Sequence, residues 1–89
     1  MFENETPVAW QAMPRRAPVV DGGGEEIGTA EAVLGDENED IFHGIVARMK
    51  HDGKTVEIPA ARIKRMTTGH VITDLGPDEA AGLAPYSEG

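Results

Sequence analysis

The sequence predicts an all-β fold, a small and strongly bent antiparallel β-barrel of about five to six strands. Three observations predict it. Apolar residues alternate along short segments instead of recurring at helical spacing. Turn-forming residues interrupt these segments at intervals of roughly 8 to 12 positions. The chain has 89 residues and few aromatic side chains, so its small core favours a closed architecture, a docked terminus or a partner subunit.

A turn rich in glycine separates the first two predicted strands. Val19 and Val20 are β-branched and predict a short first strand. The second strand begins at Ile27, and Gly28 stands where a β-bulge would restore the alternation of the apolar residues that follow. The turn between the strands consists of residues that tolerate a positive φ, namely Asp21, Gly22, Gly23 and Gly24.

The longest predicted strand covers residues 41–50. Alternate positions of this strand are expected to face the core. They hold Ile41, Ile45, Ala47 and Met49, with His43 in the same row. Phe42 and Val46 have the opposite parity and are expected to face outward. An outward pair of large apolar side chains is a candidate surface for binding a protein partner.

The next strand, at residues 55–58, is expected to return from this one through a hairpin. Asp52 and Gly53 are the dipeptide that a two-residue hairpin turn prefers. Pro59 ends the returning strand, because proline cannot donate a hydrogen bond to the ladder. A one-turn helix is expected directly after it.

The rest of the chain predicts a last hairpin at residues 64–74 and a short C-terminal helix. Pro77 occupies the first helical position that proline favours, with Gly76 as the cap before it. We therefore expect three parts: an extended N-terminal arm at residues 1–17, the barrel at residues 18–75, and a short helix with a frayed tail at residues 76–89.

The residues 19–36, VVDGGGEEIGTAEAVLGD, resemble the start of PRC-barrel domains, and residues 56–59 with Ile63 and Val71 resemble later strands of that family. The resemblance implies a bent barrel that serves as a non-enzymatic interaction module. Members occur in the photosynthetic reaction centre H subunit and in a ribosome maturation factor that engages a ribosomal protein. Ala30 replaces a bulkier family residue, so part of the core is expected to come from elsewhere, such as the arm.

The charge balance limits the partners. Sixteen acidic residues against eight basic ones give a net charge of −8. This field repels phosphate backbones and anionic lipids, which argues against direct nucleic-acid binding and membrane attachment. The acidic N-terminus and the lack of a long apolar run predict no signal peptide and no membrane span, and so a cytoplasmic location. A protein partner, or a second copy in a homodimer, is the expected ligand.

Catalysis and cofactors are not expected. The chain has no cysteine, and its one serine, Ser87, falls in the expected tail, so no nucleophile is paired with a base. Gly23 and Gly28 have the spacing of a phosphate-binding loop, but Thr29 replaces the lysine and a strand pattern follows. A turn is therefore the better interpretation of the glycine cluster.

A weak site for a divalent cation is one alternative. Asp36, Asn38 and Asp40 alternate like the start of a calcium loop, and His43 follows closely. Ile41 occupies the position where such a loop needs glycine, so a solvated acidic loop is favoured over a metal site.

Two other hypotheses remain. The first is a protein-binding or scaffold module that uses Phe42 and Val46, with Trp10 as a further candidate. Trp10 either seals one end of a poor core or is an exposed anchor for a partner. The second, by analogy with the maturation factor, is an accessory factor in RNA processing or ribosome assembly that acts through protein contacts.

Overall fold

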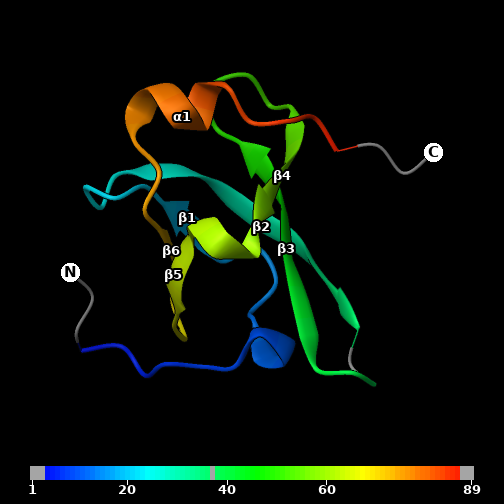
Figure 1. Cartoon of the computed structure of the whole chain (residues 1–89). Coiled ribbons are helices and arrows are strands. Elements are labelled where there is room, and N and C mark those ends of the chain that lie inside the picture. Colours follow the sequence, from blue (N-terminus) through cyan, green and yellow to red (C-terminus); the bar gives the residue numbers. More distant parts are fainter. Residues whose placement is uncertain (1–3, 37, 87–89) are drawn as a thin grey trace.

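The computed structural model describes residues 4–36 and 38–86, which form a curled sheet with one short helix at its end (Figure 1). The all-β class is confirmed, and Ser87 lies outside the described residues. The strands are β1 (Pro18–Val20), β2 (Glu26–Asp36), β3 (Ile41–Met49), β4 (Thr55–Pro59), β5 (Ile63–Met66) and β6 (Val71–Thr73). The helical elements are η1 (Trp10–Ala12), η2 (Ala60–Arg62) and α1 (Pro77–Ala81).

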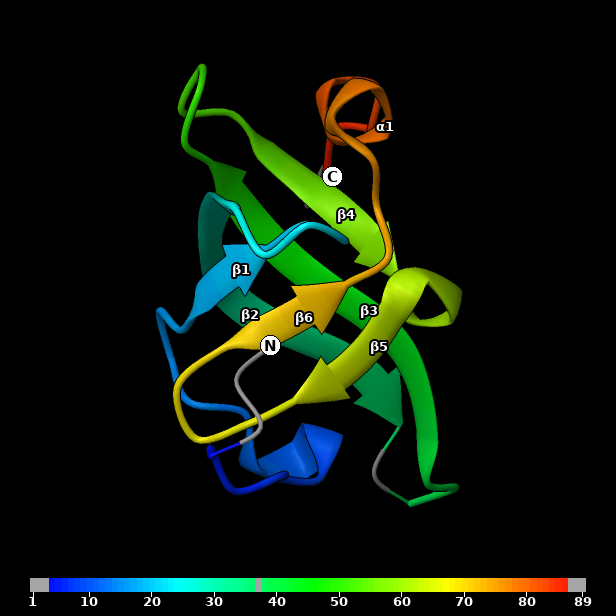
Figure 2. The ribbon, with the colours of Figure 1, turned by 90° about the vertical axis from the view of Figure 1, so that its left-hand side faces the viewer.

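The strand order explains why the sheet curls. It is β4-β3-β2-β1-β6-β5, so the two edge strands, β4 and β5, are neighbours in the sequence. Only η2 joins them, and a connection of that length reaches about 15 Å when fully extended. The sheet must therefore bend until its edges approach each other at this end (Figure 2). No ladder joins β4 to β5 within the described residues, so the barrel is open and not closed.

One strand pair departs from the antiparallel pattern expected. β1 and β6 are parallel, with Val19 opposite Val71 and Val20 opposite Ile72. A parallel pair needs a long connection, and the four strands between β1 and β6 provide one. The β5–β6 hairpin is thus joined to the meander of β1 to β4 by the pairing of β6 with β1.

The predicted turn between β1 and β2 is present, and Asp21 organises it. Its Oδ1 accepts hydrogen bonds from the backbone N–H groups of Gly23, at 2.9 Å, and Glu25, at 3.0 Å. Gly24 adopts a φ of 87°, which few residues other than glycine tolerate. The turn is anchored to the end of the sheet, because the Gly22 N–H donates to the Leu75 carbonyl at 2.9 Å.

The bulge expected at Gly28 is also present. Val19 lies opposite Gly28 but Val20 lies opposite Glu26, so Ile27 is the extra residue. A Cβ atom at position 28 would collide with the carbonyl oxygen of Arg48 on β3. Glycine is therefore required here by the close approach of two backbones.

The core inside the curled sheet is thin at its centre. Ala30 and Ala47 face each other across β2 and β3, and both are fully buried. The missing volume comes from outside the sheet, as the replacement at Ala30 led us to expect. Leu75 and Ala80, which flank the start of α1, are buried in the core. Partly buried side chains from the arm and the C-terminus also pack against it, namely Val8, Trp10, Met13 and Leu83.

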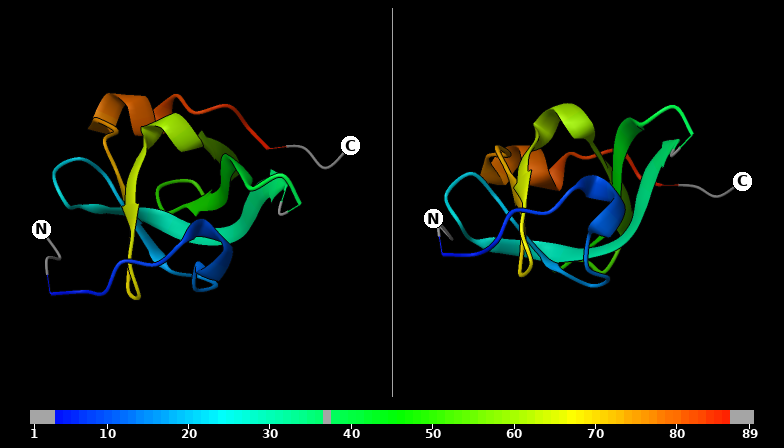
Figure 3. Two further views of the ribbon diagram at one scale, coloured as in Figure 1. Left: turned by 60° about the horizontal axis from the view of Figure 1, so that its bottom comes forward. Right: turned by 90° about the horizontal axis from the view of Figure 1, so that it is seen from below.

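The N-terminal arm crosses one end of the curled sheet (Figure 3). It is largely extended, as expected, apart from the single turn of η1. Its Val8 N–H donates to the Met66 carbonyl at 2.9 Å, and its Thr6 carbonyl accepts from the Thr68 N–H at 3.0 Å. The arm therefore lies beside the end of β5, one edge of the sheet.

The C-terminal segment covers the other edge. A frayed tail was expected from residue 84 on, but residues 84–86 are paired with β4. The Glu57 N–H donates to the Ala84 carbonyl at 3.1 Å, and the Tyr86 N–H donates to the Thr55 carbonyl at 3.0 Å. The unpaired backbone groups of an edge strand attract any extended segment, and the sequence pattern does not reveal this pairing.

Candidate functional site

Two aromatic rings from distant parts of the chain stack at one end of the sheet. Trp10 of η1 and Phe42 of β3 have ring centroids 5.5 Å apart and an interplanar angle of 16°. The indole lies over Gly35 of β2, where a Cβ atom would come within 2.9 Å of the ring. Both side chains are half-buried, and both pack against the core. Trp10 therefore closes one end of the core and still presents part of its ring to solvent.

The turn between β2 and β3, which lies next to this stack, is acidic; we call it the acidic hairpin end. Ile41 is 41% exposed and is the large apolar side chain that the described residues leave most open to solvent. Asp36, Glu39 and Asp40 in the same hairpin end are exposed. We call Trp10, Phe42, Ile41 and these three acids the aromatic end. The Asp40 Oδ1 accepts a hydrogen bond from Gln11 Nε2 at 2.9 Å, which ties the hairpin to the arm.

Val46 does not belong to this surface, so its predicted outward exposure is wrong. The side chain is 5% exposed, although it has the parity of Phe42. It lines a hollow of about 450 Å³ together with Arg15 from the arm and Tyr86 from the C-terminus. The two terminal segments therefore reach the face of β3 that the alternation assigned to solvent.

A bulge in β3 changes the predicted inward row of this strand. Leu34 lies opposite Gly44 and Gly35 opposite Phe42, so His43 is the extra residue between them. His43 is exposed as a result, and Ile41 is also exposed. The row that faces the core thus starts at Ile45, which is fully buried.

The carboxylates of the acidic hairpin end are engaged locally. The Asp36 Oδ1 accepts the Asn38 N–H at 2.9 Å, and Asp40 binds Gln11 as described. Among the described residues, no three acidic, histidine or cysteine side chains converge on a point that could hold a metal ion. The geometry therefore gives no support to a divalent site at Asp36, Asp40 and His43.

A polar cluster fastens the arm to the hairpin of β5 and β6. Thr67 Oγ1 donates to Glu5 Oε1 at 2.6 Å, and His70 Nδ1 lies 2.8 Å from the same oxygen. The hydrogen bond from Thr67 and then that from His70 lower the pKa of the Glu5 carboxyl below its ordinary value. Thr67 is fully buried, so its hydroxyl cannot meet a substrate. We call this cluster of Glu5, Thr67 and His70 the Glu5 latch. The sequence did not predict it, because Glu5 is 62 positions from Thr67 and 65 from His70.

A second polar cluster holds α1. Arg62 of η2 contacts Asp74 through Nε at 2.7 Å and Glu79 through Nη1 at 2.6 Å. The hydrogen bonds to Glu79 and then to Asp74 raise the pKa of Arg62. The hydrogen bond from Arg62, followed by that from the Gly76 N–H, lowers the pKa of Glu79. These contacts join the helix to the connection between the two edge strands.

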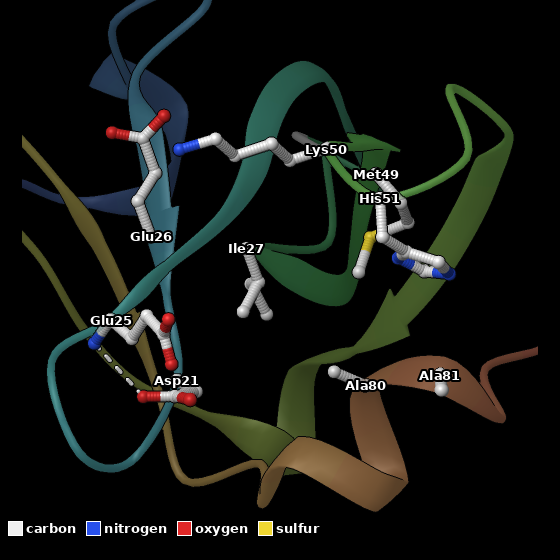
Figure 4. A pocket seen from close by; sticks show the side chains of 9 residues that line it. All are labelled: Asp21, Glu25, Glu26, Ile27, Met49, Lys50, His51, Ala80 and Ala81. Carbon is white, nitrogen blue, oxygen red and sulfur yellow. Dashed lines mark hydrogen bonds between the residues drawn. The ribbon is translucent and has the colours of Figure 1, made fainter.

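A cavity of about 340 Å³ lies beneath α1 (Figure 4). Ile27, Met49 and Ala80 supply its apolar lining, and Asp21 and Lys50 are among its charged residues. The sequence predicted Asp21 as a turn residue only. Its place in a cavity depends on α1 and on the turn after β3, which come from the far half of the chain.

No protein-family model matches this chain, and no curated protein matches it. None of the helices in residues 4–36 and 38–86 is both long and apolar enough to cross a bilayer. The functional assignment therefore depends on the geometry of the sites described above.

Proposed function

We propose that the chain is a non-enzymatic protein-binding module with a PRC-barrel-like fold, and that the aromatic end is its binding surface. The features behind the family resemblance support the proposal. The resemblance is carried by residues that form the turn at Asp21 and the strand that ends at Pro59 in this chain. The main observation that supports the aromatic end as the binding surface is the half-exposed stack of Trp10 on Phe42.

The stack has the properties of a binding anchor. Aromatic rings bring a large apolar area into an interface and lose little side-chain freedom on binding. The Trp10 ring is already fixed by Gly35 and Phe42, so a partner need not order it. The exposed Ile41 extends the apolar area.

The acidic hairpin end defines the partner's chemistry. Asp36, Glu39 and Asp40 are exposed around the apolar side chains. Complementary charge steers association and suppresses unsuitable partners. We therefore propose a protein segment that carries an apolar side chain flanked by lysine or arginine. A second copy of this chain would bring the same acids to the contact, so a different protein is favoured over self-association.

The test compares proteins retained from a cell extract by immobilised wild type, Ile41→Ser, Phe42→Ser and the control Ala61→Ser. Ile41 is exposed and its replacement spares the core, whereas Ala61 is an exposed residue of η2 outside the aromatic end. We expect wild type and Ala61→Ser to retain the same partner proteins, and both other variants to lose them. Moderate salt should weaken this retention. Equal retention by all four proteins would exclude the aromatic end as the binding surface.

Sedimentation equilibrium on the same four proteins distinguishes the two kinds of partner. A monomeric wild type is expected. If wild type is a dimer and Ile41→Ser is a monomer, the partner is a second copy of the chain and not a different protein.

A further inference from the structure

α1, which borders the cavity through Ala80 and Ala81, lies at the opposite end of the molecule from η1 and the turn between β2 and β3 (Figures 1 and 2). The cavity's volume of about 340 Å³ is within the range of roughly 300 to 1,000 Å³ that small-molecule sites occupy. An inference about this cavity is therefore independent of the proposed protein-binding surface.

The lining combines an apolar floor with an excess of negative charge. Ile27, Met49 and Ala80 supply aliphatic and thioether surface. Three carboxylates, those of Asp21, Glu25 and Glu26, stand against the one ammonium of Lys50. In Figure 4, Lys50 and Glu26 extend across the upper part of the view, whereas Asp21 and Glu25 lie together at the lower left.

The lower end of the cavity is therefore the more acidic one. His51 also lines the cavity, and its Nε2 lies 3.3 Å from Asp52 Oδ2 on the hairpin turn. In Figure 4, His51 lies on the opposite side of the view from Asp21 and Glu25.

Asp21 provides an independent indication of a ligand. It is 4% exposed, and only its Oδ1 is engaged, by the N–H groups of Gly23 and Glu25. Oδ2 receives no hydrogen bond from the described residues. Every completely enclosed side-chain oxygen among these residues has a partner, so Oδ2 is accessible, and Asp21 lines the cavity.

We propose that this cavity binds a primary alkylammonium group. The ammonium donates a hydrogen bond to Asp21 Oδ2 and is further stabilised by the negative charge of Glu25, while its methylene chain packs on Ile27, Met49 and Ala80. Such a ligand satisfies the open carboxylate oxygen and covers the apolar floor with one molecule. A phosphate or carboxylate ligand would meet the excess negative charge.

A metal ion fits the same cavity poorly. It would need several oxygen or nitrogen ligands around one point, and no such group of three side chains exists among the described residues. The aliphatic floor would contribute nothing to its binding. An alkylammonium group can come from a free amine or from a lysine side chain, and the chemistry of the site is the same for both.

The test is a titration of the ¹⁵N-labelled protein with n-pentylammonium chloride, followed by ¹H–¹⁵N correlation spectra. The amides of Gly23 and Glu25 are the reporters, because both donate to the Asp21 carboxylate. We expect saturable shifts at these amides and at Ile27, with a dissociation constant on the order of 1 mM for so small a ligand. n-Pentanol has the same chain without the charge and should not saturate them.

Variants separate the cavity from general charge effects. Asp21→Asn keeps the Oδ1 acceptor and the turn but removes the charge, and should weaken binding roughly tenfold or more. Glu25→Gln, at an exposed position, should weaken it to a smaller extent. Glu57→Gln makes the same charge change on β4, outside the cavity lining, and should have no effect. The proposal is overturned if no amide saturates, if pentanol binds equally, or if Glu25→Gln and Asp21→Asn both bind as wild type does.

Two further probes identify the source of the ammonium. Saturation of the same amides by N-acetyl-lysine N-methylamide supports a lysine side chain of a protein. Saturation by 1,5-diaminopentane but not by the lysine amide supports a free amine. Failure of both probes would overturn the site, and the Ile41→Ser variant should bind either probe as wild type does.

Discussion

The two terminal segments cover opposite edges of the same open sheet, but they are held by different means. The C-terminal segment inserts Leu75, which is 1% exposed, and Ala80 into the core before it pairs with β4. The N-terminal arm is held beside β5 by the Glu5 latch and by the half-exposed stack of Trp10 on Phe42. The C-terminal segment thus places a large side chain, that of Leu75, fully inside the core, whereas the large side chains of the arm are only partly buried.

This difference indicates a division of roles along the chain. Ala30 faces Ala47 at the centre of the sheet, and the C-terminal segment adds Leu75 and Ala80 to the core. The arm leaves part of its aromatic contact in solvent, where a partner can reach it. The proposed binding surface thus lies at the end opposite the segment that supplies Leu75 to the core, and the predictions that follow compare the two ends.

The largest effect is expected for Leu75→Ala. Emptying a fully buried leucine site should reduce the free energy of unfolding by about 3 kcal/mol. Trp10→Ala should cost less, although it removes more atoms, because the indole is only half-buried. Urea unfolding followed by circular dichroism measures both, since the second variant lacks the fluorophore. A cost for Trp10→Ala that equals or exceeds that of Leu75→Ala would break the comparison.

The second-largest effect is expected for the contact between the rings of Trp10 and Phe42. A double-mutant cycle of Trp10→Ala and Phe42→Ala should give a coupling energy of about 1 kcal/mol, as for stacked aromatic pairs elsewhere. The matched cycle pairs Phe42→Ala with Leu83→Ala, a partly buried residue of the C-terminal segment. That second cycle should give a coupling near zero. Equal coupling in both cycles would mean that the stack has no specific energy.

The two polar clusters predict a loss of stability in acid. The pKa values of Glu5 and Glu79 are lowered from an ordinary value of 4.5. A carboxyl group whose pKa is lowered by folding stabilises the folded state above the unfolded pKa, and this contribution is lost as the pH falls through the folded pKa. Stability should therefore decline below pH 4.5. Glu5→Gln and Glu79→Gln should each make that decline shallower in urea unfolding at a series of pH values.

Solvent screening makes this acid effect smaller than the two before it, because both carboxylates are exposed in part. Glu39→Gln is the matched control, since Glu39 is an exposed acid outside both clusters. An acid decline that remains equally steep in Glu5→Gln, Glu79→Gln and the control would show that neither cluster contributes.

Local signals in the sequence predicted the strands and turns well. Asp21 with the glycines after it and Pro59 each have a backbone preference that requires no knowledge of distant residues. Asp52 and Gly53 do lie in the turn between β3 and β4, but the predicted two-residue turn is wrong, because Arg48 pairs with Thr55 and the Met49 N–H donates to the Lys54 carbonyl. The bulge at Gly28 could be predicted because Ile27 breaks the alternation. Elements that depend on one residue's own conformational limits are therefore within reach of sequence reasoning.

The candidate sites were harder to predict, because they depend on contacts between distant segments. Val46 has outward parity, but it lies in a hollow that Arg15 and Tyr86 also line. Gly44 directly follows the bulge at His43, as Gly28 follows the extra residue Ile27. No break in the alternation of apolar residues marks this bulge, however, because His43 occupies a position in the predicted inward row. The bulge shifts the register of every residue before it in β3. The stack of Trp10 on Phe42 likewise forms only once the arm has docked.

The smallest effect is expected where the C-terminal segment pairs with β4. A chain that ends at Leu83 lacks the Ala84 carbonyl, which accepts the Glu57 N–H at 3.1 Å. Hydrogen exchange at the Glu57 amide should accelerate roughly fivefold to tenfold, the equivalent of one exposed hydrogen bond. A chain that ends at Tyr86 keeps this bond and is the control.

The amide of Met49 separates this local opening from a global loss of stability. Its N–H donates to the Lys54 carbonyl at 2.8 Å, far from the removed residues in the sequence, so its exchange should not change. If Met49 and Glu57 accelerate together, residues 84–86 support the whole fold and not only the edge of β4. The C-terminal segment would then contribute to stability beyond its buried Leu75 and Ala80.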